Sequence, residues 1–406
     1  MQTQLAEHIK HTAIGLEADA ILRSCVHCGL CTATCPTYRL LGDERDGPRG
    51  RIYLIKQMLE GETPTAKTQL HLDRCLTCRA CETACPSGVR YGRLLEIGRD
   101  ILAENVGRRW LDRCQRKALR MIVPYPQRFA LLLRLAGWFR PFLPKALAKK
   151  IPVPSLGVAG AGSEPAPTRH PRAMLVLEGC VQPALAPSIN AAATHVLDRL
   201  GISLIPAPKA GCCGAVSYHL AATEEGLDFM RRNIDAWMPY LDQGAEAIVM
   251  TASGCGLMVK QYAEALKHDP AYANQAARVS ALTLDLAEVL AREDLGRLTV
   301  GQGRRVAFQS PCTLQHGQQL NGLVEGLLTR LGFQLTPVAQ PQICCGSAGT
   351  YSILQPKLAQ RLLDGKLQAL SEGKPDCIAT ANIGCLTHLQ AGTDLPVVHW
   401  VELLDR

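Results

Sequence analysis

Apolar residues recur at helical spacing in the first quarter of the chain. The pattern is typical of amphipathic helices over residues 52–59 and 93–106, and residues 16–24 have helical composition. Gly61 lies just beyond the segment 52–59, where a glycine commonly ends a helix. The sequence therefore predicts an α-helical N-terminal domain over residues 1–106.

The hydrophobic pattern changes in the second half of the chain, where short apolar runs alternate with helical segments. A predicted strand at 173–177 precedes a predicted helix at 189–200, and the same order returns at 305–308 and 322–331. Strands that alternate with helices predict α/β units with mainly parallel sheets. We therefore expect two repeated α/β units. They cover residues 172–300 and 301–406.

The region 107–171 connects these parts and has two different halves. Arginines and large apolar residues, including Trp110 and Trp138, alternate through 107–150. Such a basic amphipathic segment can lie on an anionic membrane or dock on a partner, and the alternative is a helix pair packed on the N-terminal domain. Residues 151–171 are rich in proline, glycine and alanine, which predicts a linker.

The composition is that of an ordinary globular protein of two or three domains, with 406 residues, 47% hydrophobic and 20% charged. The sequence contains no apolar run of about 18 residues, so we expect no transmembrane segment. Its 18 cysteines occur without a recognisable export signal, which favours metal ligands in a reducing compartment. The net charge of +8 is too dispersed for a nucleic-acid binder. We expect a cytoplasmic protein at the inner face of the cell membrane.

Eight cysteines form two identical C-x2-C-x2-C-x3-C-P runs, at 25–36 and 75–86. Three cysteines at this spacing can curl around three corners of a [4Fe–4S] cube, and in two-cluster ferredoxins the fourth reaches the other cube. Zinc is the alternative, but structural zinc sites usually present paired C-x2-4-C halves. We expect cluster 1 to be held by Cys25, Cys28, Cys31 and Cys85, and cluster 2 by Cys75, Cys78, Cys81 and Cys35.

Each α/β unit carries four more cysteines in a repeated order. A single cysteine precedes an adjacent Cys-Cys-Gly by 32 residues in both units, from 180 to 212 and from 312 to 344, and a Gly-Cys follows a later strand. These cysteines end predicted strands or open predicted helices, which places them at the carboxyl edge of the sheet, where open α/β sheets have their binding sites. The candidate ligands of a further cluster are Cys180, Cys212, Cys213 and Cys255, and Cys312, Cys344, Cys345 and Cys385. The alternative is that these are buried cysteines that only pack.

The repeated cysteine pattern resembles the CCG domains of heterodisulfide reductases, which hold an unusual iron–sulfur cluster. The closing C-x2-C of that family is incomplete here, because Ala252 and Asn382 stand three residues before Cys255 and Cys385. A five-thiolate site is therefore not expected, whereas four thiolates per unit suit one cubane cluster.

The whole chain resembles the iron–sulfur subunits of membrane-associated flavin dehydrogenases, in particular those of the glycolate oxidase (glycolate dehydrogenase) family. The stretches 23–38, 41–57 and 251–256 carry this resemblance. It implies an electron-transfer subunit with no catalytic residues of its own. Electrons would come from an FAD-containing subunit that oxidises glycolate to glyoxylate, beside a second flavoprotein-like subunit, and pass towards a quinone or another membrane acceptor.

Three other interpretations remain open from the sequence. The chain could serve a dehydrogenase for glycerol 3-phosphate or lactate, act as a thiol–disulfide enzyme like heterodisulfide reductase, or anchor flavin subunits. No dinucleotide fingerprint, P-loop or nucleophile elbow is recognisable. The sequence thus predicts a chain that carries electrons for chemistry done elsewhere.

Overall fold

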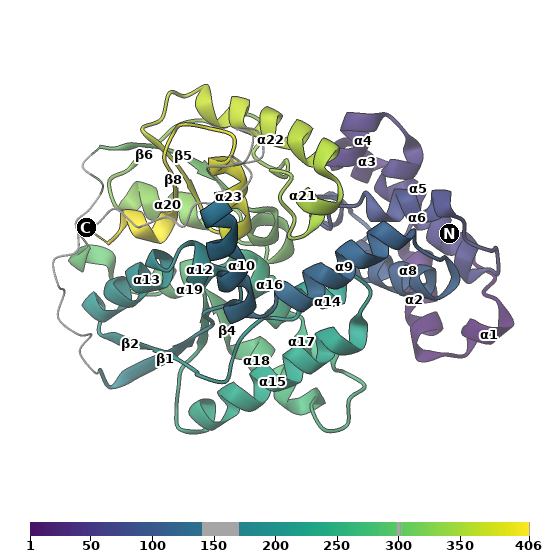
Figure 1. Ribbon diagram of the computed structural model, residues 1–406, viewed down its shortest axis with the longest axis horizontal. Coiled ribbons are helices and arrows are strands. Elements are labelled where there is room, and N and C mark those ends of the chain that lie inside the picture. The colour runs from purple at the N-terminus through teal and green to yellow at the C-terminus, as the bar shows by residue number, and fades with distance from the viewer. Residues whose placement is uncertain (140–169, 299–300, 302, 406) are drawn as a thin grey trace.

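The computed structural model describes residues 1–139, 170–298, 301 and 303–405, so most of the predicted linker lies outside the described residues. Figure 1 shows a helical N-terminal part beside two α/β units. The chain is therefore α/β overall with a helical N-terminal domain, as predicted. The predicted domain boundaries after residues 106 and 171 fall between elements, while the one after 300 adjoins residues outside the description. All three stay predictions.

The N-terminal part consists of short helices around one small core. Its elements are α1 (Glu7–Lys10), α2 (Ala13–Ser24), α3 (Leu30–Thr34), α4 (Pro36–Leu41), η1 (Glu44–Asp46), α5 (Pro48–Leu59), α6 (Ala66–Asp73), α7 (Ala80–Thr83) and α8 (Tyr91–Asn105). The helices predicted at 16–24, 52–59 and 93–106 are confirmed as α2, α5 and α8. Gly98 lets α8 approach α5 closely, because a Cβ there would lie 2.7 Å from Cγ1 of Ile55.

Both α/β units contain a four-stranded parallel sheet with the same strand order. The first sheet is β2-β1-β3-β4, built from β1 (Arg172–Val176), β2 (Ile202–Pro206), β3 (Ile248–Met250) and β4 (Thr283–Asp285). The second is β6-β5-β7-β8, built from β5 (Arg305–Gln309), β6 (Gln334–Leu335), β7 (Cys377–Thr380) and β8 (Val397–His399). The predicted repeat is therefore a repeat of topology as well as of sequence.

Helices cover both sheets. The first unit contains α12 (Gln182–Leu185), α13 (Ser188–Arg199), α14 (Ala215–His219), α15 (Thr223–Asp242), α16 (Ser253–Lys260), α17 (Tyr262–Ala265), α18 (Ala273–Leu282), α19 (Leu286–Ala291) and η3 (Leu295–Arg297). The second contains the π-helix η4 (Thr313–Gly317), α20 (Leu323–Arg330), α21 (Tyr351–Leu354), α22 (Pro356–Ser371), α23 (Ile383–Gln390) and η5 (Trp400–Leu403).

The two α/β units share one hydrophobic core, to which β1 and β3 contribute from the first unit and β5 and β7 from the second. Polar contacts join the carboxyl ends of their strands. Nε2 of the buried His399 lies 2.8 Å from the carbonyl oxygen of Thr251, and the amide of Ser253 donates to the carbonyl of Ala381 at 3.1 Å. The cysteine-bearing edges of both sheets therefore lie close to this junction.

Helices α9 (Trp110–Ile122) and α10 (Pro126–Phe139) connect the N-terminal part to the α/β units (Figure 1). Arg108 and Arg116 form ion pairs with Asp73 at 2.7 and 3.2 Å, and Nε of Arg120 donates to Glu225 at 3.0 Å. One side of the pair is thus packed, as one of the two alternatives predicted. Large apolar side chains of both helices remain exposed, and we call this set the outer apolar face: Trp110, Leu111, Met121, Leu131, Leu132, Leu135 and Trp138.

None of the helices described for residues 1–139, 170–298 and 303–405 combines the length and apolar character that crossing a membrane requires.

Candidate metal centres

The four cysteines predicted to hold cluster 1 line one hollow of the N-terminal part, together with Cys81, which is predicted for cluster 2. Cys25, Cys28 and Cys31 come from the loop before α3 and its first turn, and Cys85 follows α7. The loop can curl because His27 and Gly29 have left-handed backbone, with φ of 57° and 85°.

Two thiols of this hollow, those of Cys81 and Cys85, come from the other cysteine run. Burial and the charges of Cys25, Cys28 and Cys85 raise the pKa of Cys31 to about 11. Helices α3 and α7 lie side by side, and Thr34 Oγ1 of α3 donates to the carbonyl of Ala80 on α7 at 3.3 Å. This contact brings the end of each run next to the start of the other.

The cysteines predicted to hold cluster 2 gather in a more buried place. The loop 75–79 repeats the backbone of 25–29, because Thr77 and Arg79 have φ of 55° and 59°. Burial, followed by the charges of Cys78, Cys75, Glu82 and Cys35, raises the pKa of Cys81 well above its usual range. Cys35 therefore lies among the thiols of the second run, while Cys85 lies among those of the first.

Cationic and hydroxyl groups surround Cys75. The Tyr91 hydroxyl lies 3.5 Å from Cys75 Sγ and the Thr77 amide 3.4 Å from it. Burial raises the pKa of Cys75. The charges of Arg51 and Arg99 and these two hydrogen bonds lower it by more than burial raises it, so the pKa ends below the ordinary value. The site thus favours the thiolate that a metal ligand requires.

Arg51 lies beneath this site with its side chain 1% exposed. Burial lowers its pKa, but the charges of Cys75, Tyr91 and Cys35 together raise it above its usual range. The arginine therefore lies where it can compensate negative charge on these thiols and does not lie on a solvated face. Its neighbour Arg49 lines the cluster 1 hollow, partly exposed, and pairs with Glu44 at 2.6 Å.

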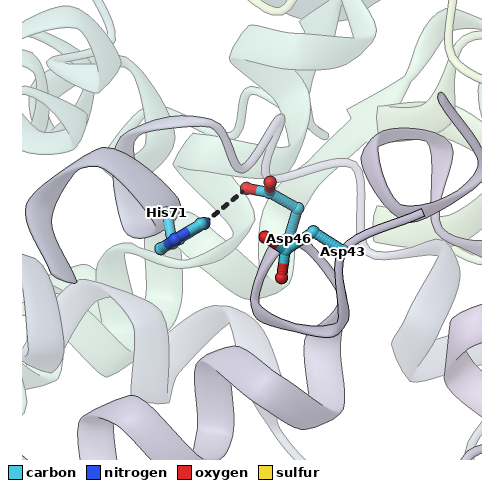
Figure 2. Close-up of side chains that lie close together, drawn as sticks. All are labelled: Asp43, Asp46 and His71. Atoms are coloured by element: carbon cyan, nitrogen blue, oxygen red, sulfur yellow. Dashed lines mark hydrogen bonds and ion pairs between the residues drawn. The ribbon is translucent and has the colours of Figure 1, made fainter. Parts of the chain in front are cut away.

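An acidic group that sequence reasoning missed lies behind Arg51. Figure 2 shows Asp43, Asp46 and His71 with their polar atoms close together. Asp46 is fully buried and contacts His71 at 3.0 Å, Arg74 at 2.9 Å and Arg51 at 3.6 Å, while Asp43 pairs with Arg45 at 2.8 Å. These basic partners already compensate the carboxylates, so we interpret the group as an internal ion network that holds Arg51.

The first α/β unit gathers its four cysteines at the carboxyl edge of its sheet, and we call this group site A: Cys180, Cys212, Cys213 and Cys255. Cys213 lies between its neighbours, and hydrogen bonds from the thiols of Cys212 and Cys255 hold its pKa well below the usual range. Gly214 makes the turn after the pair with φ of 89°, and a Cβ there would lie 2.7 Å from the carbonyl oxygen of Gly226.

The second unit forms the corresponding group, which we call site B: Cys312, Cys344, Cys345 and Cys385. Sγ of Cys312 lies 3.9 Å from that of Cys344, and Cys345 is within hydrogen-bond reach of Cys344 and Cys385. Asn382 stands where a fifth cysteine would be, and its Nδ2 donates to Cys385 Sγ at 3.6 Å. Each site therefore brings together four thiols from the segments that follow three strands of its sheet. Of the other cysteines, Cys114 is exposed and Cys377 is buried in β7.

Several residues around these groups belong to no motif in the sequence. Tyr91, Arg99 and Lys366 reach the cysteines only through tertiary packing. The only signal that could have pointed to them is polar character within predicted helical segments.

Comparison with known proteins fits this geometry. Residues 21–89 match the family model described as 4Fe-4S dicluster domain, and residues 174–260 and 306–390 each match the one described as Cysteine-rich domain. The chain therefore contains an iron–sulfur domain with two repeated cysteine-rich domains. The matched ranges include all eight cysteines of the two runs and the eight of sites A and B.

Several relatives align with most or all of the chain. It is 56% identical over 406 residues to the glycolate oxidase iron-sulfur subunit of Escherichia coli (strain K12), covering 100% of this chain and 99% of that protein. It is 30% identical over 416 residues to the probable glycolate oxidase iron-sulfur subunit of Bacillus subtilis (strain 168), covering 94% and 93%. Lactate utilization protein A of Bacillus licheniformis is 25% identical over 239 residues, 56% of this chain and 96% of that protein. The chain belongs to the family of glycolate oxidase iron–sulfur subunits.

Proposed function

We propose that this chain is the electron-transfer subunit of a flavin-dependent glycolate dehydrogenase. A partner subunit containing FAD would oxidise glycolate to glyoxylate, and this chain would pass the electrons towards a quinone or another membrane acceptor. The observation that carries the proposal is the full-length identity of 56% to a glycolate oxidase iron-sulfur subunit. The grouping of eight cysteines into two sets of four supports it.

The proposal assigns a ligand role to each cysteine of the two runs. Cluster 1 would be held by Cys25, Cys28, Cys31 and Cys85, and cluster 2 by Cys75, Cys78, Cys81 and Cys35. When bound, [4Fe–4S] clusters accept and release single electrons. The protein would hold cluster 2 in a largely buried place whose negative charge Arg51 offsets.

The surroundings of the two sets indicate where a partner would exchange electrons. Cys28 is exposed, and Val26 and Leu30 at the rim of the cluster 1 hollow are 68% and 57% exposed. Cys75 and Cys81 are buried. We therefore infer that the flavoprotein partner approaches cluster 1, because electron transfer between proteins requires the cofactors to come close.

A second part of the proposal concerns the membrane. The outer apolar face of α9 and α10 exposes two tryptophans and several aliphatic side chains next to arginines, a composition suited to the surface of an anionic bilayer. We propose that the complex lies on the cytoplasmic face of the cell membrane through this face. Of the arginines that define the segment, Arg140 lies outside the described residues.

Isolation of the native complex tests the main proposal. We expect the chain to co-purify anaerobically with flavin-containing subunits, and glycolate to reduce its clusters within one turnover. Lactate and glycerol 3-phosphate serve as competing substrates, and the isolated chain should oxidise none of the three. Faster cluster reduction by lactate or glycerol 3-phosphate than by glycolate would assign the subunit to a different dehydrogenase.

A further inference from the structure

We propose that site B holds a third iron–sulfur centre that receives one electron directly from cluster 2, and that Lys366 provides positive charge to this centre. Site A lies outside this path. The inference rests on the proposed electron-transfer function and goes beyond it, because it gives the two repeated units different roles.

The first observation is an apolar joint between cluster 2 and site B. Cys78 packs into the same hydrophobic group as Cys312 and Cys344. The residues that complete this joint come from the N-terminal part and from the second α/β unit: Leu40, Leu41, Leu76, Tyr351, Leu358 and Leu362. Burial raises the pKa of the Cys78 thiol, and the charge of the nearby Cys312 raises it further.

Hydrogen bonds fix the two sides of this joint. The Tyr351 hydroxyl donates to the carbonyl of Arg74 at 3.1 Å, next to Cys75 in the sequence. Thr83 Oγ1 lies 3.0 Å from Nδ1 of His316, which belongs to the helix that follows Cys312. Site B is therefore held in a constant position against the ligands of cluster 2, as efficient electron transfer requires.

Site A has a different boundary with the N-terminal part. A polar pocket lies between them, with Arg93 bonded to the Tyr218 hydroxyl at 3.4 Å and paired with Glu96 at 3.7 Å. Cys180 and Cys212 of site A pack instead against Phe229 and against Tyr125, which lies between α9 and α10. No cysteine of the two runs takes part in the described packing around site A.

Lys366 is the second observation. This lysine on α22 is only 3% exposed, and its Nζ donates to the carbonyls of Gln340 and Pro341 at 3.3 and 3.2 Å. Burial lowers its pKa and the charges of the four site B thiols offset only part of this effect, so the pKa of Lys366 ends below its usual value. Among the described residues no carboxylate pairs with it. A buried ammonium group needs a negative partner, and site B is the place where one can form.

The repeat itself provides a comparison for Lys366. A Cβ on Gly214, the turn glycine of site A, would lie 2.7 Å from the carbonyl oxygen of Gly226. A Cβ on Gly346, the turn glycine of site B, would lie 2.6 Å from the carbonyl oxygen of Ala359. Seven residues further along each helix, from 226 to 233 and from 359 to 366, stand Asn233 and Lys366. Asn233 is neutral and fully bonded, donating to the carbonyl of Cys212 at 2.9 Å and accepting from the amide of Gly211 at 2.9 Å. Equivalent positions thus hold a cation at site B and an amide at site A.

These observations define the redox step. Reduced cluster 2 loses one electron and the centre at site B gains it, with no bond formed or broken and no proton transferred. A cluster held by thiolates carries net negative charge, which becomes more negative on reduction. The ammonium group of Lys366 therefore stabilises the reduced centre and raises its reduction potential.

The test uses the full chain, purified anaerobically and reduced with dithionite so that no flavin partner is needed. We expect about twelve iron atoms, about four for each of three cubane clusters. Cys345→Ala should remove about four of them and leave the EPR signals of clusters 1 and 2. The matched change Cys213→Ala at site A should leave the EPR signal of the site B centre in place. Only eight iron atoms in the wild-type chain, or loss of the site B signal in Cys213→Ala, would overturn the proposal.

Two spectroscopic readouts test the path and the lysine. Magnetic interaction between reduced cluster 2 and the reduced site B centre should broaden the EPR signal of cluster 2. Cys345→Ala should remove this contribution to the broadening. Lys366→Met should shift the midpoint potential of the third centre to a lower value without loss of iron, whereas Lys357→Met on the exposed side of α22 should not. Absence of magnetic coupling would overturn the direct path. Absence of a shift in the midpoint potential would overturn the role of Lys366. These results are independent of whether glycolate reduces the complex, so the proposed function fails or succeeds separately.

Discussion

The hydroxyl of Tyr91, at the start of α8, donates a hydrogen bond to Sγ of Cys75 over 3.5 Å. Both residues are buried. Hydrogen bonds to the sulfurs of an iron–sulfur cluster stabilise its reduced, more negative state. If Cys75 holds cluster 2 as proposed, this contact would raise the reduction potential of that cluster.

Tyr91→Phe should lower the midpoint potential of cluster 2 by tens of millivolts. A loss of about 0.5–1 kcal/mol of differential hydrogen bonding corresponds to ~20–40 mV, because 59 mV is tenfold in a one-electron equilibrium. EPR-monitored redox titration measures the shift. Tyr53→Phe is the control, since Tyr53 is 49% exposed. An unchanged potential in Tyr91→Phe would show that the hydroxyl does not tune the cluster.

The crossing of the two cysteine runs predicts which cluster each substitution damages. Cys35→Ala should leave cluster 2 with three thiolates, prone to lose one iron, and cluster 1 intact. Cys85→Ala should have the opposite effect. EPR of the reduced protein distinguishes the clusters.

A double variant separates this arrangement from local ligation. Cys35→Ala combined with Cys78→Ala should remove two ligands of cluster 2 and preserve the cubane EPR signal of cluster 1. Loss of both signals, with circular dichroism unchanged, would contradict the exchanged ligands.

Asp285 predicts a pH dependence of stability. It is 2% exposed and caps α19 by accepting from the amide of Ala287 at 3.0 Å, and burial raises its pKa to about 7. Between about pH 4 and pH 7 the folded chain therefore holds a proton that the unfolded chain has released, so this group makes stability fall as pH rises through that window. The change should amount to a few kcal/mol at most.

Denaturant unfolding at several pH values measures this effect. Asp285→Asn cannot titrate and should reduce the loss of stability between pH 4 and pH 7. Asp294→Asn is the matched control, because Asp294 also caps a helix, by accepting from the amide of Gly296 at 3.0 Å, but is exposed. An equal pH profile for Asp285→Asn and the wild type would assign the dependence to other groups.

The outer apolar face of α9 and α10 should decide membrane binding. Leu131→Ser, Leu135→Ser and Trp138→Ser together should weaken binding to anionic vesicles by tenfold or more, since each large side chain buried in lipid contributes about 1.5–3 kcal/mol. Co-sedimentation of the complex measures this. Ile353→Ser, an equally apolar change at a residue that is 49% exposed elsewhere, is the control.

Charge at the same face gives an independent prediction. Replacing Arg128, Arg134 and Arg140 by Glu should release the complex from anionic vesicles at moderate salt, because each basic residue near such a surface contributes about 1 kcal/mol. Arg128 already donates to the carbonyl of Met121 at 2.9 Å and stacks on Tyr125, so Arg134 should matter more among the described positions. Unchanged sedimentation would assign this segment to internal packing alone.

Much of the fold and the candidate sites followed from local sequence. The helices α2, α5 and α8 and the repeated α/β units were readable because helical and strand periodicity depend on neighbouring residues alone. The two cysteine runs were readable for the same reason: a loop that curls around one cube needs its cysteines three residues apart. Sequence could also place Cys180 to Cys255 and Cys312 to Cys385 at sheet edges, since parallel strands set that edge.

Tertiary structure decided how these parts act on one another. Arg51 in the sequence is one of several arginines at a helix start, and only packing places it beneath Cys75 and beside the buried Asp46. The apolar group that includes Cys78 and Cys312 joins residues far apart in the chain, and Lys366 and the site B thiols are likewise distant in sequence. Burial and charge compensation arise from surfaces that meet only in the folded chain. The periodicity of a sequence does not specify which of its surfaces will meet.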